Sequence, residues 1–262
     1  MSEGPNVIQW ARSLERLVGE PFEAVMLPGT YESQAEALVG ECITAVDTHG
    51  KHLLVRLSDG RTLHCHGMLD GYWDVAAAGR VPPPEGTVRV RLQTSEHEAL
   101  FLNSPVVELL TVEELARHRR LTALGPDVMS AEFDREEAGR RLRAAGTEIA
   151  EAIVNQTVVA GIGNIYKAEG LFLAGIHPER AAAEVSREEV EALWDAVIPL
   201  MWREANDPGP WTTLPPELSE TGESHWVYGR SGRPCLRCEA RIRFMRQGRY
   251  RRATFYCPGC QR

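Results

Sequence analysis

Residues 226–262 read WVYGRSGRPCLRCEARIRFMRQGRYRRATFYCPGCQR and contain two C-x-x-C pairs, Cys235 with Cys238 and Cys257 with Cys260. A short turn of this kind directs two thiolates at one centre, and four sulfurs suit a tetrahedral Zn²⁺ ion. The 18 residues between the pairs fit the usual spacing of such sites. The stretch therefore predicts a hairpin held by one structural zinc ion. Two disulfides are the alternative, and they would require an oxidising compartment.

The same stretch is strongly basic. It holds ten arginines and one acid, Glu239, which gives a net charge of +9. The whole chain carries −8, so residues 1–225 carry −17. A zinc-held hairpin whose charged side chains are almost all positive, on an otherwise acidic protein, is typical of a module that binds phosphates. The alternative is a solvated charged face, which usually mixes both signs.

Length and composition favour an ordinary globular protein. The 262 residues suggest two domains plus the hairpin. No apolar run approaches the roughly 18–20 residues of a membrane span, and the first residues do not resemble a signal peptide. Cys42 and Cys65 lie in apolar, strand-like contexts and are expected to be buried free thiols. These features predict a cytoplasmic protein. Lys51 and Lys167 are the only lysines beside 27 arginines, so each lysine invites a specific explanation.

Residues 3–18 are predicted to form a helix, because Val7, Ala11, Leu14 and Val18 repeat at intervals of three and four. From about 36 to 112 the pattern changes to short alternating strands separated by turn signals. These strands are expected at residues 37–50, 51–57, 62–67, 88–94, 98–103 and 106–112. Several short strands at this spacing predict an antiparallel sandwich or barrel.

The second half of the chain has helical spacing after a Gly-Pro break in the connector at 124–134. The stretch from about 206 to 225 is rich in Pro, Gly, Ser and Thr and is predicted to be a loop. The expected helices cover residues 136–146, 148–156, 165–175 and 186–205.

Two of these helices meet at the turn VVAGIGNIYKAEGL, residues 158–171. Gly161 and Gly163 allow a tight turn, and Asn164 begins the next helix. Backbone N–H groups at a helix N-terminus form an anion site that suits a DNA phosphate. An ordinary capped helix is the alternative.

Seven segments in a fixed order resemble the formamidopyrimidine-DNA glycosylase/endonuclease VIII family, and the resemblance covers the full chain. It is closer to the endonuclease VIII branch, because the residues after His66-Gly67 come from one loop. The segments are MSEGP (1–5), THGK (48–51), HGML (66–69), LGPD (124–127), NQTVVAGIGNIYKAEGLFLAGIHP (155–178), VYGRSGRPCLRC (227–238) and RRATFYCPGCQ (251–261).

The resemblance implies an α+β fold in which an N-terminal antiparallel β-sandwich with an N-terminal helix precedes a helical helix–two-turns–helix domain and a zinc-finger β-hairpin. It also implies excision of oxidised bases, here pyrimidines, followed by cleavage of the abasic strand in damaged double-stranded DNA. A monomer in the bacterial cytoplasm, associated with the nucleoid, is expected. The implied parts are a catalytic domain over 1–122, a linker over 123–133, the DNA-binding domain over 134–225 and the zinc finger over 226–262.

The catalytic residues carry over to the chain terminus. The family usually has Pro after the initiator Met, and its α-amine attacks C1′ of the damaged nucleoside; here that residue is Ser2. A primary α-amine has a pKa of about 7.7–8.0, against about 10.4 for lysine, so it can form a Schiff base once Met1 is removed. Glu3 matches the catalytic acid, although sequence alone would assign it to the helix dipole. Asn6 replaces a second family Glu, which bears on the proton relay.

The DNA-binding residues carry over in the same way. Lys51 matches the hairpin lysine beside the lesion, which also belongs to the catalytic set. Asn164 matches the phosphate-binding asparagine, and Arg252 matches the finger arginine, with Arg251 beside it. Base flipping leaves a gap in the duplex; Met68 and Leu69 stand where the family fills it. For these two, a strand end packed in the core is the alternative.

The histidines His64, His66, His177 and His225 show no spacing that suggests a metal site with a third ligand, so we interpret them as structural or close to phosphate. Two other functions stay open. Ser2 and Asn6 would suit a family member that binds damaged or abasic DNA without cutting it. The basic zinc-held hairpin alone would suit a protein that binds RNA or another partner.

Overall fold

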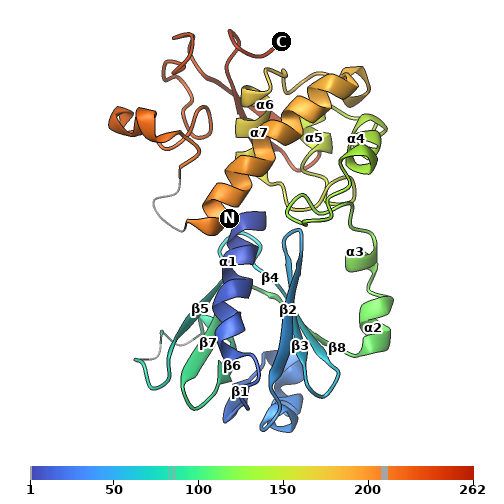
Figure 1. Cartoon of the computed structure of the whole chain (residues 1–262), viewed down its shortest axis with the longest axis vertical. Coiled ribbons are helices and arrows are strands. Elements are labelled where there is room, and N and C mark those ends of the chain that lie inside the picture. Colours follow the sequence, from blue (N-terminus) through green and yellow to red (C-terminus); the bar gives the residue numbers. More distant parts are fainter. Residues whose placement is uncertain (1, 82, 85, 208–211) are drawn as a thin grey trace. The chain divides into compact units, whose positions relative to one another are not determined.

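The computed structural model describes residues 2–81, 83–84, 86–207 and 212–262 (Figure 1). The chain forms two compact units, residues 1–123 and 124–262. No helix within the described ranges is both long and apolar enough to cross a membrane.

The first unit contains two four-stranded antiparallel sheets. In one the strand order is β1-β6-β7-β5, and in the other it is β2-β3-β4-β8. The predicted antiparallel sandwich is therefore confirmed. The strands are β1 (Ala24–Met26), β2 (Ile43–His49), β3 (His52–Leu57), β4 (Thr62–His66), β5 (Tyr72–Ala77), β6 (Val88–Gln93), β7 (His97–Leu102) and β8 (Val106–Leu110).

A single apolar core lies between these sheets and the first helix, α1 (Gly4–Leu14). Val7 and Leu14 on α1 are fully buried, because their spacing places them on one face. Helix α1 contacts β2 and β3 of one sheet and β5 of the other (Figure 1). The core therefore fixes the start of the chain against both sheets. A short 3-10 helix, Glu15–Leu17, continues α1, in agreement with the predicted helix over 3–18.

Strand prediction missed two elements of this unit. The short strand β1 was not expected, and neither was β5, whose alanines and aspartate weaken a strand pattern. Strand β5 forms because Trp73 stacks on Phe101 of β7, with ring centroids 5.2 Å apart. Residues 36–42, predicted as strand, begin instead with a 3-10 helix, Glu36–Leu38. The other short elements are a 3-10 helix at Gly29–Gln34, α2 (Val112–Ala116) and α3 (Arg119–Thr122).

The second unit is helical and ends in a hairpin. Helices α6 and α7 pack closely at Gly170, where an added Cβ would approach Leu193 and Val197 at 3.3 Å. The four predicted helices are all present. They are α4 (Arg135–Arg143), α5 (Ile149–Ala152), α6 (Asn164–Leu173) and α7 (Arg187–Asn206), with a 3-10 helix at Ala182–Glu184.

The last strands, β9 (Arg243–Gln247) and β10 (Arg252–Tyr256), pair antiparallel. They pack on α6 through a small cluster that includes Phe172, Val227 and Ile242. Glu169 of α6 is fully buried and accepts the backbone N–H groups of residues 226–228 at 2.8–2.9 Å. One carboxylate thus ties the start of the hairpin segment to α6. The predicted loop over 206–225 contains a 3-10 helix, Pro216–Thr221; its residues 208–211 lie outside the described ranges.

Candidate functional site

Ser2 lies at the start of α1 and contacts the loop after β4. Its backbone N–H donates to the Met68 carbonyl at 3.3 Å, and its Oγ donates to the same oxygen at 3.0 Å. Met68 and Leu69 are 48% and 60% exposed. Because both side chains are exposed, they are not a strand end packed in the core. Met1, on whose removal the Schiff-base prediction depends, lies outside the described residues.

The loop that receives Ser2 is tightly built. His66 Nδ1 accepts the Met68 N–H at 3.0 Å, and Met68 has a positive φ of 53°. Ser104 Oγ donates to the His66 carbonyl at 2.6 Å. A Cβ at Gly67 would lie 2.6 Å from Trp10 Cη2 and 2.9 Å from Ser2 Oγ. Glycine is therefore required for this close approach, a role that the His-Gly dipeptide alone did not reveal.

Glu3 precedes the first residue of α1 and is fully buried. Its backbone N–H donates to Asn6 Oδ1 at 3.0 Å, and the Asn6 N–H donates to the Glu3 carbonyl at 3.1 Å. Asn6 is thus a capping residue that fixes the backbone of Glu3. A carboxylate at this position could also accept that bond, but it would place a negative charge beside Glu3.

Lys51 occupies the tight turn between β2 and β3, where His49 pairs with His52. The turn lies close to His66: burial, and secondly the charge of Lys51, lower the pKa of His66 to about 4. The positive charge of Lys51 and the loop that holds Ser2 are therefore neighbours in the first unit.

The histidines correct the sequence interpretation in one respect. His64 does have partners for a three-ligand group, because the ligand atoms of His64, Glu108 and His118 lie within 4.8 Å of one another. Both partners are far from His64 in the sequence, so spacing could not reveal them. The contacts form a hydrogen-bonded chain: His52 Nδ1 to His64 Nε2 is 2.8 Å, His64 Nδ1 to Glu108 is 2.7 Å, and His118 Nε2 to Glu108 is 3.0 Å.

The tautomers of this chain are consistent without a metal. His118 Nδ1 accepts the Leu121 N–H at 3.3 Å, so its Nε2 carries the proton that Glu108 accepts. Burial is the main cause that lowers the pKa of His64. Burial is also the main cause that lowers the pKa of His52 to about 2. Neutral imidazoles whose donated bonds converge on Glu108 satisfy these contacts, and we interpret the group as a structural support for β3 and β4.

In the second unit, the glycine turn before α6 is braced by Gln156. Its Nε2 donates to the carbonyls of Val154 and Ile162, both at 3.0 Å, and its Oε1 accepts the Gly161 N–H at 3.0 Å. Gly161 has a φ of 102°, which favours glycine. These hydrogen bonds fix the turn that precedes Asn164, the first residue of α6.

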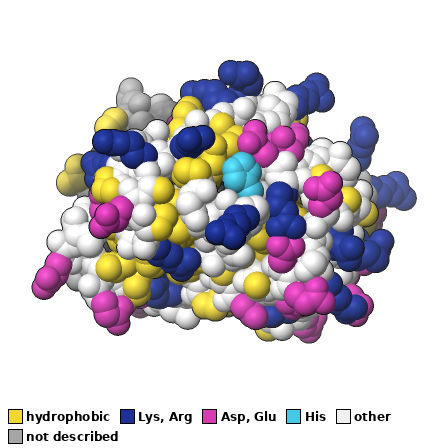
Figure 2. All heavy atoms as spheres, turned by 90° about the horizontal axis from the view of Figure 1, so that it is seen from above, with side chains coloured by type: hydrophobic (Ala, Val, Ile, Leu, Met, Phe, Trp, Pro, Cys, Tyr) yellow, Lys and Arg dark blue, Asp and Glu magenta, His cyan; other side chains and the backbone are white. Residues whose placement is uncertain are grey.

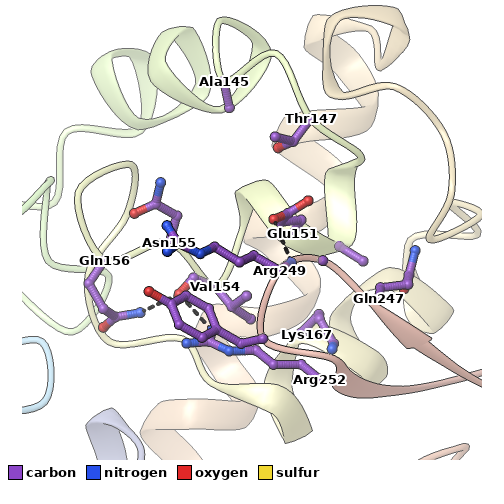
Figure 3. Close-up of a pocket in the computed structure, with 13 residues that line it drawn as sticks. Ala145, Thr147, Glu151, Val154, Asn155, Gln156, Lys167, Gln247, Arg249 and Arg252 are labelled. Atoms are coloured by element: carbon purple, nitrogen blue, oxygen red, sulfur yellow. Dashed lines mark hydrogen bonds between the residues drawn. The ribbon is translucent and has the colours of Figure 1, made fainter.

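A cavity of about 360 Å³ opens beside this turn (Figure 3). Arg249, Tyr250 and Arg252 from the hairpin line one side, and residues 150–151 and 154–156 line the other. Arg252 Nη1 donates to the Val154 carbonyl at 3.3 Å, and its guanidinium lies 5.6 Å from the Tyr250 ring centre. Tyr250 is 74% exposed. The predicted phosphate-binding arginine is therefore held against the helix–turn segment by its own contacts.

The arginines of residues 226–262 remain largely uncompensated. Within the part of the chain that the structure describes, ion pairs engage Arg230 and Arg233 with Glu223, and none of the other eight. Figure 2 shows basic side chains spread over one face of the molecule with acidic ones among them. The basic excess thus lies in the hairpin segment itself, where it is available to an anionic partner.

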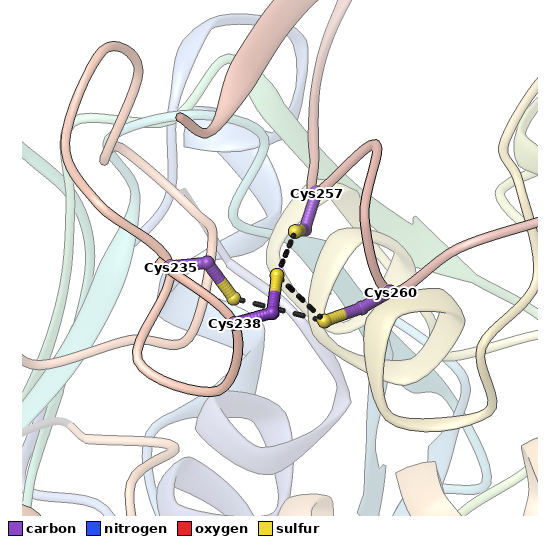
Figure 4. A group of neighbouring side chains, drawn as sticks. All are labelled: Cys235, Cys238, Cys257 and Cys260. Atoms are coloured by element: carbon purple, nitrogen blue, oxygen red, sulfur yellow. Dashed lines mark hydrogen bonds between the residues drawn. The ribbon is translucent and has the colours of Figure 1, made fainter. Parts of the chain in front are cut away.

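The four cysteines converge on one point (Figure 4). Sγ of Cys238 lies 3.4 Å from those of Cys257 and Cys260, and Cys235 Sγ lies 3.8 Å from Cys260 Sγ. A disulfide would require about 2.05 Å, whereas four sulfurs around Zn²⁺ at about 2.3 Å lie about 3.8 Å apart. A Cβ at residue 259 would approach Cys238 Sγ at 2.9 Å, so Gly259 keeps the sulfur centre open. This donor set fits zinc.

Comparison with known proteins identifies the family. Residues 1–105 match the formamidopyrimidine-DNA glycosylase N-terminal domain, and residues 124–208 match the formamidopyrimidine-DNA glycosylase H2TH domain. The chain is 34% identical over its full length to a Streptomyces coelicolor protein named "Probable endonuclease 8 2", covering 94% of that protein. The chain belongs to the formamidopyrimidine-DNA glycosylase/endonuclease VIII family. Endonuclease 8 of Klebsiella pneumoniae is 31% identical, with both chains covered completely.

Solved structures of this family agree with the fold. The crystal structure of Lactococcus lactis formamidopyrimidine-DNA glycosylase, bound non-covalently to DNA containing an AP site, superposes with a TM-score of 0.83. It is 25% identical, and each chain is covered completely. The α+β prediction of a sandwich followed by a helical domain and a cysteine-bearing hairpin is confirmed.

The predicted site residues of this family member fall into two groups, one in each unit. Ser2, Glu3, Lys51, Met68 and Leu69 belong to the first unit, and the structure joins Ser2 directly to Met68. In the second unit, Asn164, Arg251, Arg252 and the four cysteines lie on α6 and the hairpin. Sequence reasoning did not assign roles to Gly67, Ser104 and Lys167, which contact residues distant in the chain. It also missed Gln156, whose partners lie within six residues.

Proposed function

We propose that this protein is a base-excision-repair DNA glycosylase with AP-lyase activity that removes oxidised pyrimidines from duplex DNA. Family membership over the whole chain supports this activity, and the curated relatives named above are endonuclease 8 proteins. The observation that carries the proposal is the fixed chain terminus: the backbone nitrogen and the hydroxyl of Ser2 converge on the Met68 carbonyl. A nucleophile must be held in place to react efficiently.

The proposed chemistry begins once Met1 has been removed and the Ser2 nitrogen is an α-amine. Its lone pair attacks C1′ of the flipped nucleotide, and the base leaves with the electron pair of its bond to C1′. The nitrogen loses a proton, the C1′–O4′ bond breaks, and a Schiff base forms between the nitrogen and C1′ of the opened sugar. Glu3 supplies the proton that the sugar oxygen or the departing base requires. Loss of a C2′ proton from the resulting Schiff base then breaks the C3′–O bond, and water releases the amine.

The remaining assignments concern DNA and metal. Lys51, Asn164, Arg251 and Arg252 are proposed to bind phosphates, and the exposed Met68 and Leu69 to fill the gap left by the flipped base. The second unit is proposed to comprise a linker that ends at residue 133, a DNA-binding part over 134–225 and a finger over 226–262. Cys235, Cys238, Cys257 and Cys260 would hold one Zn²⁺ ion, which supplies folding energy and no reactive group. The protein would act as a monomer at the bacterial nucleoid.

Ser2 in place of proline favours a second candidate, a protein that binds abasic DNA without cutting it. The two candidates differ in a covalent intermediate. Borohydride is expected to trap an adduct between abasic duplex DNA and protein shown by mass spectrometry to lack Met1. The matched control retains Met1 behind an uncleaved N-terminal tag and should form no adduct. Absence of adduct from the processed protein, together with tight binding to an abasic analogue, would favour the binder.

A further inference from the structure

Lys167 on α6 has an environment that the proposed activity does not yet explain. It is one of two lysines in the chain, and its side chain is 1% exposed. Its ammonium donates to Asn164 Oδ1 at 3.3 Å, to the Ala253 carbonyl at 2.8 Å and to Thr254 Oγ1 at 2.9 Å. These contacts join the start of α6 to strand β10, two segments almost 90 residues apart in the sequence.

Burying an ammonium group is costly unless its hydrogen bonds are made. The ammonium of Lys167 has three N–H donors, and the three oxygens match them one for one. A lysine that served only to fill space could be replaced by an apolar side chain at lower cost. The geometry therefore indicates that the donors themselves are used.

The contact with Asn164 has a direct chemical consequence. An asparagine amide presents an acceptor oxygen on one side and an N–H₂ donor group on the other. Lysine has donors only, so Lys167 can bond only to the oxygen, and this bond fixes which way the amide faces. The N–H₂ group of Asn164 is then directed away from Lys167, and a phosphate oxygen that accepts from it would approach from that side.

The contacts with β10 act on the second phosphate-binding residue. Arg252 immediately precedes Ala253, whose carbonyl accepts from Lys167. Lys167, Arg249 and Arg252 also line the same cavity (Figure 3). One buried ammonium thus holds the backbone next to Arg252 and the side chain of Asn164 at once.

We infer that Lys167 is a positioning residue that orients the Asn164 amide and anchors Arg252, so that the two groups bind the DNA backbone as one unit. The inference rests on the proposed function, because it assigns Asn164 and Arg252 to phosphates. It adds a residue whose buried side chain acts through them.

The test measures binding of the full-length protein to a duplex that contains a tetrahydrofuran abasic analogue. Lys167→Met keeps the length and apolar stem of the side chain and removes all three donors. The Kd is expected to rise about 10- to 100-fold, while the metal content stays equal to that of the wild type. Lys167→Gln retains one N–H₂ donor and should bind with intermediate affinity; it also serves if the methionine variant folds poorly.

A double-mutant cycle separates positioning from simple stabilisation. If Lys167 acts through Asn164, then adding Asn164→Ala to Lys167→Met should raise the Kd little further. Effects that multiply in the double variant would overturn the inference, and so would wild-type affinity in Lys167→Met. Tyr166→Phe is the matched control, since it removes a hydrogen bond to Glu204 from the same helix and should leave the Kd unchanged.

Failure of the two proposals can be told apart. If wild-type protein does not prefer the abasic duplex over undamaged duplex, the proposed function itself is wrong. If wild-type protein shows that preference and Lys167→Met retains it with unchanged Kd, only the role of Lys167 is wrong.

Discussion

The β-sandwich of the first unit and the hairpin segment over 226–262 are stabilised in different ways. The sandwich has a continuous core of aliphatic and aromatic side chains from both sheets and α1. In the hairpin segment, the buried members of the apolar cluster are Val227, Ile242 and two cysteines. So small an apolar area cannot offset the entropy of ordering the chain, so the segment depends on cross-links. Hydrophobic burial therefore stabilises the region that carries the proposed nucleophile, whereas the cysteine cluster and buried polar contacts stabilise the region that carries Arg252, which is proposed to bind phosphate.

The largest expected effect comes from the hairpin. Cys257→Ser should abolish stoichiometric zinc binding and disorder β9 and β10, because structural zinc sites contribute about 10–16 kcal/mol to folding. Abasic-duplex binding should be lost while the sandwich still unfolds cooperatively, as measured by metal analysis, gel shift and calorimetry. Cys42→Ser changes a thiol of the first unit and is the control. Full zinc content and an ordered hairpin in Cys257→Ser would contradict the view that the cysteine cluster stabilises the hairpin segment.

The next effect is on the sandwich. Phe101 is fully buried against Trp73 and Trp10, so Phe101→Ala should lower the free energy of unfolding of the first unit by about 3–5 kcal/mol. Denaturant unfolding followed by tryptophan fluorescence measures this. Phe101→Leu should cost less, and metal content should be unchanged in both variants. Loss of zinc in Phe101→Ala would show that the two regions are not independently stabilised.

A smaller effect is expected for the arginine that the hairpin carries. Arg252→Ala should weaken binding to the abasic analogue about 10- to 100-fold, because a hydrogen bond to a charged group contributes about 1.5–3 kcal/mol. Zinc content should stay at that of the wild type. Arg241→Ala removes the same charge from the hairpin, away from the cavity, and should weaken binding much less. Equal losses would mean that net charge alone attracts the DNA.

The smallest expected effect is the pH dependence of stability conferred by histidine. It is expected in the first unit and not in the hairpin segment, because residues 226–262 contain no histidine. The pKa of His66 is lowered to about 4 in the folded protein, whereas it is about 6.5 in the unfolded chain. Between these values the unfolded chain binds more protons, so stability is fully present above pH 6.5 and falls as the pH falls toward 4. His66→Gln should reduce the loss between pH 7 and pH 5 by about 1–2 kcal/mol, as measured by denaturant unfolding of each protein. An unchanged pH dependence would show that His66 is not the group responsible.

Much of the fold could be predicted because its signals are local. The apolar stripe of α1, the glycine turn before Asn164 and the two C-x-x-C pairs each lie within a few residues. One of the two strands missed in the sandwich, β5, is held by Trp73 against Phe101, a contact between segments that no local pattern relates. The hydrogen bonds that link His52, His64 and Glu108 could not be predicted for the same reason.

The sequence by itself determined the family, the zinc-type cysteine set and the positions proposed to attack the sugar and bind phosphate, because motif order and spacing are properties of the chain. Tertiary structure alone decided how those residues are held. It placed Ser2 on the Met68 carbonyl, required Gly67 beneath it, used Asn6 to cap Glu3 and joined Lys167 to Asn164 and β10. Each of these contacts is a directional hydrogen bond or a close steric approach. Apart from the local Asn6 cap and the Lys167–Asn164 bond within α6, each joins residues that become neighbours only when the chain folds.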